Sequence, residues 1–149
     1  MSTIQNKLPT IARYLLGVIF FVFGLNGFLH FIPQPPMSGP PANFIGALLA
    51  TGYLFPLLKG TEVVAGALLL SNRYVPLALA LLAPVVINIV AFHAFLAPAG
   101  LAVPIVVLVA ELYLARSYRD SFAPMLQAQN TPHTNTPASS RPRVHATAS

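Results

Sequence analysis

Long apolar stretches, separated by short polar or proline-rich breaks, fill the first 118 residues of the chain. The segment 14–32 has 19 residues without a charge, and the segment 74–110 has 37. A membrane-spanning helix needs about 20 apolar residues, so the second segment is too long for one span and suits two. We therefore predict an all-α fold, an antiparallel bundle of four transmembrane helices. The spans are expected at about 11–32, 53–71, 74–96 and 101–118.

Proline and glycine mark the breaks between these helices. Five of the nine residues in 33–41 are proline, so we expect no helix there. The apolar stretch 43–71 would be about 43 Å long as one helix, against a hydrocarbon core of about 30 Å. We predict a break near Gly52. It leaves a short interfacial helix at about 43–50, capped by Asn43, ahead of the second span.

The composition excludes an ordinary soluble domain. Apolar residues make up 56% of the 149 residues and charged residues 7%, whereas soluble proteins carry about 25% charged residues. The absence of cysteine excludes disulfides, iron–sulfur clusters, thiolate zinc sites and thiol redox chemistry. We expect 1–125 to form one membrane domain. Residues 126–149 are polar and rich in Thr, Pro and Ser, which predicts a disordered cytoplasmic tail.

The net charge of +5 is explained by where the cations lie. Those near the spans fall on one side of the predicted bundle: Lys7, Arg13, Arg73, Arg116 and Arg119. The loops 33–52 and 97–100 contain no Lys or Arg. Because cytoplasmic loops carry the excess of these residues, we predict a multi-pass protein of the inner (cytoplasmic) membrane of a bacterium. Both termini lie in the cytoplasm, the lipid bilayer is the main partner, and no nucleic-acid partner is needed.

Seven polar side chains fall within the predicted spans, and they form the candidate ligand pocket. They are Asn26, His30, Lys59, Glu62, Asn88, His93 and Glu111. Counted from the outer helix ends at about 1.5 Å per residue, all seven lie between the outer surface and the midplane. This one-sided distribution predicts a polar pocket that opens outward, with at least one member from each helix.

The two acids in this set have different surroundings. Glu62 has Lys59 one turn earlier on the same helix face, so the pair is either a structural ion pair or part of a ligand or proton site. Glu111 has no basic neighbour within its own helix before Arg116. It must pair across helices, face water or stay protonated. Intramembrane ionisable residues favour a functional interpretation in both cases.

The remaining polar residues also allow two interpretations. Asn26 and His30 share a helix face, and Gly24 and Gly27 allow a second helix to approach closely. Interhelical hydrogen bonding is as good an explanation as function for Asn26 and for Asn88. His30 and His93 lie at similar depth and two histidines can hold a b-type haem, yet a histidine near the interface is more often a satisfied polar group. The sequence therefore gives no firm indication of a haem, which it disfavours, and it predicts no metal site.

Three segments carry a resemblance to a known family. Arg13–Gly17 (RYLLG), Phe23–Phe31 (FGLNGFLHF) and Glu62–Leu70 (EVVAGALLL) resemble the first and second helices of DoxX-like bacterial membrane proteins. The resemblance covers about residues 8–125 and implies a four-span plan. The family is named for a subunit associated with a thiosulfate:quinone oxidoreductase, and relatives are linked to membrane redox complexes. By matching position, it points to Asn26, His30 and Glu62 as pocket members.

The leading functional hypothesis is a small subunit that contacts quinone or another lipophilic ligand beside a membrane redox partner. The wider family includes thiol–quinone enzymes, but without cysteine their mechanism is not carried over. One alternative is a non-catalytic anchor or assembly subunit, in which the polar residues hold helices together, either with another membrane protein or by self-association. A small-solute or proton carrier is less favoured, because four helices leave little room for alternating access. Whether the protein is an enzyme stays open.

Overall fold

The structure, a computed structural model, describes residues 2–126. Its elements are α1 (Ser2–Leu29), α2 (Pro40–Ala50), α3 (Leu54–Leu70), α4 (Val75–Phe95), the 3₁₀ turn η1 (Pro98–Gly100), α5 (Ala102–Ser117), α6 (Arg119–Phe122) and the 3₁₀ turn η2 (Ala123–Leu126). None of the described residues forms a strand, so the all-α prediction is confirmed for them. The predicted tail, apart from its first residue, lies outside the described residues.

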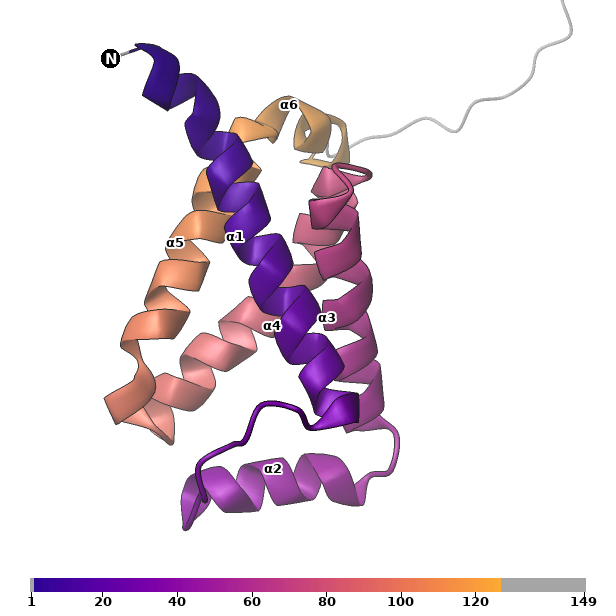
Figure 1. The fold of residues 1–149 in the computed structure, drawn as a ribbon, viewed down its shortest axis with the longest axis vertical. Coiled ribbons are helices and arrows are strands. Elements are labelled where there is room, and N and C mark those ends of the chain that lie inside the picture. The colour runs from indigo at the N-terminus through magenta and orange to yellow at the C-terminus, as the bar shows by residue number, and fades with distance from the viewer. Residues whose placement is uncertain (1, 127–149) are drawn as a thin grey trace, which may run out of the picture.

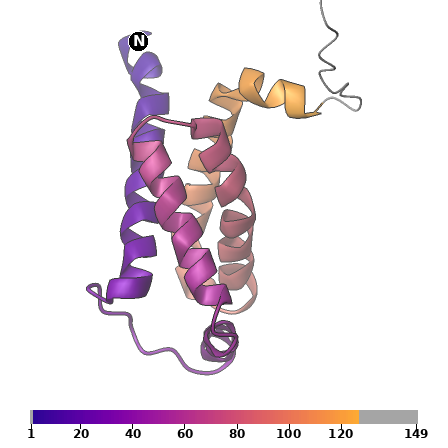
Figure 2. The ribbon, with the colours of Figure 1, turned by 90° about the vertical axis from the view of Figure 1, so that its right-hand side faces the viewer.

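Helices α1, α3, α4 and α5 pack around one apolar core, and Figures 1 and 2 show their arrangement. Helix α1 packs against α3 and α5, and α4 packs against the same two helices from the other side. The fully buried side chains at the centre are Leu16, Leu69, Leu82, Val86 and Leu114. Helix α2 lies across one end of the four, and Figure 2 shows it end-on. We call this the α2 end of the molecule.

Two of the helices are long and apolar enough to cross a membrane by themselves. They are 7–29 of α1, with 23 residues, and α4, with 21. Helices α2 and α3 pass the same test only together, and their axes are bent by 92° at the break between them, so the described residues contain two candidate spans, or three if the bent pair counts as one. These helices indicate a membrane protein.

Helix α1 differs from the predicted span at both ends. It begins at Ser2, well before residue 11, and it ends at Leu29, before residue 32. It stops early because His30 adopts a left-handed backbone conformation, with φ of 52°. The side chain of Asn26 then bonds both backbone groups of Ile32, which turns the chain away from the helix axis.

Helix α2 also begins earlier than expected. The prolines at 40 and 41 were expected to exclude helix, but they form its first turn, where a missing backbone N–H costs nothing. Gly39 precedes the helix with φ of 67°. Asn43 therefore lies within the helix, and the prediction that it caps the N-terminus was wrong. Gly52 marks the break before α3, as expected.

The other three long helices begin and end within one residue of their predicted positions. Pro76 and Pro104 lie in the first turns of α4 and α5, where proline is tolerated. Gly24, predicted to allow a close helix approach, lies directly against α3. An added Cβ there would come within 2.9 Å of the backbone N of Val63. The glycines of α1 and α3 thus set the spacing of the α1–α3 interface.

Candidate ligand cavity at the α2 end

A cavity of about 280 Å³ lies between α1, α3 and α4 and is covered by α2. Six of the seven residues selected from the sequence line it: Asn26, His30, Lys59, Glu62, Asn88 and His93. The seventh, Glu111, does not. It lines a separate, smaller cavity between α4 and α5, so the prediction that all four helices contribute a polar side chain to one pocket was wrong. Depth along a helix was estimated correctly enough to group six residues, but depth says nothing about which face of α5 Glu111 occupies.

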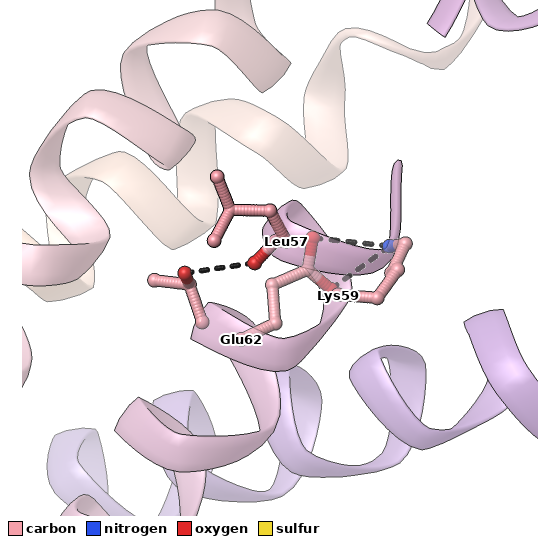
Figure 3. Close-up of polar contacts among 4 residues, drawn as sticks. Leu57, Lys59 and Glu62 are labelled. Carbon is pink, nitrogen blue, oxygen red and sulfur yellow. Dashed lines mark hydrogen bonds and ion pairs between the residues drawn. The ribbon is translucent and has the colours of Figure 1, made fainter. Parts of the chain in front are cut away.

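The strongest polar interaction in this cavity is an ion pair within α3. Lys59 Nζ donates to both carboxylate oxygens of Glu62, at 3.0 Å and 2.9 Å (Figure 3). The side chain of Glu62 is 4% exposed and that of Lys59 is 19% exposed. An ammonium has three N–H donors, and Glu62 takes two of them. The third N–H of Lys59 has no hydrogen-bond partner among the described residues.

Glycine on α1 makes room for this pair. A Cβ on Gly27 would collide with Cγ of Lys59, and a Cβ on Gly24 would lie 3.0 Å from Cβ of Glu62. The stem of Lys59 therefore runs along the bare backbone of α1. The nearby hydroxyl of Thr61 donates to the Leu57 carbonyl at 2.9 Å (Figure 3), so it does not compete for the Glu62 carboxylate.

Asn26 shapes the cavity through the loop that follows α1. Its side-chain oxygen accepts from the backbone N–H of Ile32 at 2.6 Å, and its side-chain N–H donates to the Ile32 carbonyl at 3.2 Å. Each polar atom makes one hydrogen bond to the loop after α1, and the residue is buried. Asn26 is a positioning residue that fixes where the exposed His30 enters the cavity wall.

Asn88 and His93 supply the polar groups of α4. Asn88 is exposed to the cavity, and its amide has no hydrogen-bond partner among the described residues. His93 Nδ1 lies 2.8 Å from the carbonyl of Ile89. A carbonyl only accepts, so Nδ1 carries the hydrogen, and Nε2 of the neutral ring keeps a lone pair. The cavity thus offers donors from Lys59 and Asn88 and an acceptor from His93.

Apolar side chains form most of the remaining wall, and four of them are phenylalanines that sequence reasoning did not select. Phe23, Phe44, Phe55 and Phe92 all line the cavity. The rings of Phe44 on α2 and Phe92 on α4 lie 5.4 Å apart, which joins α2 to the bundle over the cavity. Lys59 Nζ lies 5.9 Å from the centre of the Phe55 ring. Phenylalanine within an apolar helix has no signal that separates a cavity wall from a lipid contact.

Arg13 has a role that its sequence position concealed. It was expected to flank the first span as a cytoplasmic cation, but it is 6% exposed. Its guanidinium donates to the carbonyl of Leu69 and, at 3.4 Å, to that of Leu70. These carbonyls belong to the last turn of α3, and that of Leu69 also accepts from the backbone N–H of Asn72 at 3.3 Å. Arg13 therefore ties α1 to α3 at the end opposite the cavity.

His30 and His93 both line the cavity, but no three His, Cys, Asp or Glu side chains converge on a point anywhere in residues 2–126. Taken together, the fold and this cavity define an all-α protein with apolar helices compatible with a membrane. The cavity at the α2 end combines apolar and aromatic walls with a few polar groups. Comparison with models of known protein families, with curated proteins and with solved structures found no match.

Proposed function

We propose that the protein is a DoxX-like membrane subunit whose α2-end cavity binds quinone or another lipophilic ligand beside a redox partner. The observation that carries this proposal is the cavity itself. Apolar and aromatic walls surround a small number of polar groups, which is the usual make-up of a small-molecule site. Its volume of about 280 Å³ suits a quinone head group whose tail lies outside, among the lipids.

The polar groups suit both forms of such a ligand. Lys59 and Asn88 have N–H groups that a carbonyl oxygen can accept, and Nε2 of His93 can accept from a hydroxyl. A bound quinone would supply two-electron, two-proton chemistry between its carbonyl and hydroxyl forms. The residues of this chain would orient the ring between the phenylalanines and hold or release protons at the Lys59–Glu62 pair and at His93.

We also propose that α1, α3, α4 and α5 all span the inner membrane of a bacterium as an antiparallel bundle, with both termini in the cytoplasm. Helices α3 and α5 have 17 and 16 residues, or about 26 and 24 Å. That is a few ångströms short of the hydrocarbon core of about 30 Å. Local thinning of the bilayer accommodates such a mismatch at modest cost. In this orientation α2 lies in the outer interface.

Reporter fusions test the orientation. Tags at the N-terminus and the C-terminus should both report the cytoplasm, because the cations at Lys7, Arg73 and Arg116 all belong to that side. Reporters inserted in 33–41 and 97–100 should both report the outer side. A periplasmic C-terminus, or an odd number of spans, would contradict the arrangement.

Binding of a short-chain ubiquinone tests the ligand. Calorimetry on the detergent-solubilised protein should detect binding, and Asn88→Leu should weaken it about tenfold, since one hydrogen bond to the ligand is lost. Asn43→Leu is the matched control, because Asn43 is exposed on α2 and does not line the cavity. Wild-type protein that binds no quinone, or two variants with equal affinity, would oppose the proposal.

One observation favours the alternative of a non-catalytic anchor or assembly subunit. The charges of Lys59 and Glu62, and both polar atoms of Asn26, are already satisfied within the chain. Purification from the native membrane separates the two functions. A lipophilic molecule that co-purifies supports the cavity as a ligand site, whereas a stoichiometric large partner without one supports the anchor.

A further inference from the structure

The second cavity has a different chemistry from the first. It measures about 170 Å³ and lies between α4 and α5, beside α6. The two cavities share no lining residue, and Glu111 is the only ionisable side chain that lines this one. Ile87 and Leu112, at its edge, are 64% and 60% exposed on the apolar outer surface. A molecule would therefore reach the cavity from the lipid phase.

Glu111 is buried without a partner. The residue is 5% exposed, and its Oε1 has no hydrogen-bond partner although it is fully enclosed. The ion pairs among the described residues are Lys59–Glu62 and Arg119–Asp120, so Glu111 forms no ion pair within that part of the chain. A buried polar atom left unpaired costs about 1–3 kcal/mol. Glu62, by contrast, has its charge matched by Lys59.

The opposite wall of the cavity is formed by α4. Ala80 and Ala83 both line the cavity, and their small side chains leave space in front of α4. The site therefore places a single carboxyl group, which accepts N–H donors, within an apolar enclosure.

We propose that this second cavity is a binding site for a lipophilic amine, whose nitrogen bonds the carboxylate of Glu111. An amine meets each requirement of the site. It carries N–H donors for the carboxylate, it supplies the missing positive charge, and its apolar body matches the alanine, leucine and isoleucine walls. Strongly polar ligands, which would leave their own groups unpaired against these walls, are excluded.

Binding would include one proton transfer. A charged carboxylate in apolar surroundings is costly unless a cation lies beside it, so the ligand must bring the counter-charge. An uncharged amine entering from the lipid takes the proton. The O–H bond of Glu111 breaks, an N–H bond forms, and the products are an ammonium and a carboxylate in contact. No other reactant is required.

The probe for this site is 1-aminoadamantane, a compact apolar cage with a single primary amine. Calorimetry on the full-length protein in detergent should show binding to the wild type. Glu111→Gln, which keeps the shape of the side chain, should weaken it by about tenfold or more, because a hydrogen bond to a charged group is lost. Adamantan-1-ol, with the same cage and a hydroxyl, should not distinguish the two proteins. Equal affinity of the amine for both would overturn the proposal.

Two further variants separate the site from general effects. Asp120→Asn removes a carboxylate that is 98% exposed, and it should leave the affinity unchanged. Ala83→Leu fills the cavity without altering Glu111, and it should abolish binding. Circular dichroism and the gel-filtration volume establish that each variant is folded. Loss of binding in Asp120→Asn, or full binding in Ala83→Leu, would contradict the proposed location.

A reaction on the wild-type protein gives an answer that does not depend on any variant folding. Dicyclohexylcarbodiimide adds the O–H of an uncharged carboxylic acid across one of its C=N bonds, and the acyl group then moves from oxygen to nitrogen to give a stable N-acylurea. Mass spectrometry should locate this adduct on Glu111 and not on Glu62. Addition of 1-aminoadamantane should reduce the labelling. Labelling that the amine does not change would overturn the proposal.

Discussion

Lys59→Met should lower the stability of the detergent-solubilised protein by about 3–5 kcal/mol, the usual cost of leaving one member of a buried ion pair alone. Glu62 is 4% exposed and bonded through both oxygens to Lys59. No other hydrogen bond to its carboxylate exists among the described residues. Removal of Lys59 therefore leaves this carboxylate without compensation. Thermal unfolding followed by circular dichroism measures the loss.

Glu62→Leu should also destabilise the protein, but by less. The ammonium of Lys59 is more exposed than the carboxylate, and its long side chain can turn into the cavity. The double variant, in which both charges are replaced by apolar groups, should recover much of the loss, because no buried charge remains. If the double variant loses as much stability as the two single variants together, the interaction between Lys59 and Glu62 contributes nothing to stability.

The double variant also distinguishes a structural pair from a functional one. If the pair only holds α3 in the bundle, the stable double variant should bind the short-chain ubiquinone as the wild type does. If Lys59 donates its third N–H to the ligand, binding should fall about tenfold although stability has returned. We expect the second result, because placing two charged side chains beside an apolar cavity costs free energy, and α3 does not need them in order to be a helix.

Much of this architecture follows from local signals in the sequence. The limits of α3, α4 and α5 could be predicted because polar residues, glycine and proline stand directly beside the apolar stretches. Neither end of α1 could be predicted from such local signals. Its end is set by a side chain, that of Asn26, which binds the backbone of Ile32 in preference to a continued helix. No periodicity in the apolar pattern encodes such a contact.

The candidate site was predicted in part for a similar reason. Polar groups at one height in an apolar bundle tend to meet, because each needs a partner or water, and six of them line one cavity. The position of a residue along a helix does not determine which way its side chain faces around the helix axis. Glu111 was therefore assigned to the wrong cavity. Arg13 could not be found from local sequence either, since its partners are the carbonyls of Leu69 and Leu70, far along the chain.

Gly66→Ala should destabilise the bundle at the α1–α3 interface. A Cβ at residue 66 would lie 2.5 Å from the backbone N of Phe21 and 2.8 Å from its Cα. Backbone atoms cannot swing aside as a flexible side chain can, so α1 and α3 must separate. Overpacking of this kind costs about 1–3 kcal/mol. The loss should appear as a lower midpoint of thermal unfolding.

Gly60→Ala is the matched control on the same helix. An added Cβ at residue 60 meets no atom within 4 Å, so this change adds helix propensity without a clash. It should be neutral or stabilise the protein by up to about 1 kcal/mol. Opposite effects of one identical substitution at two glycines of α3 would locate the cause in the contact with α1. If both variants unfold at the same midpoint, the close approach of Gly66 to Phe21 is not what holds α1 and α3 together, and Arg13 becomes the next contact to remove.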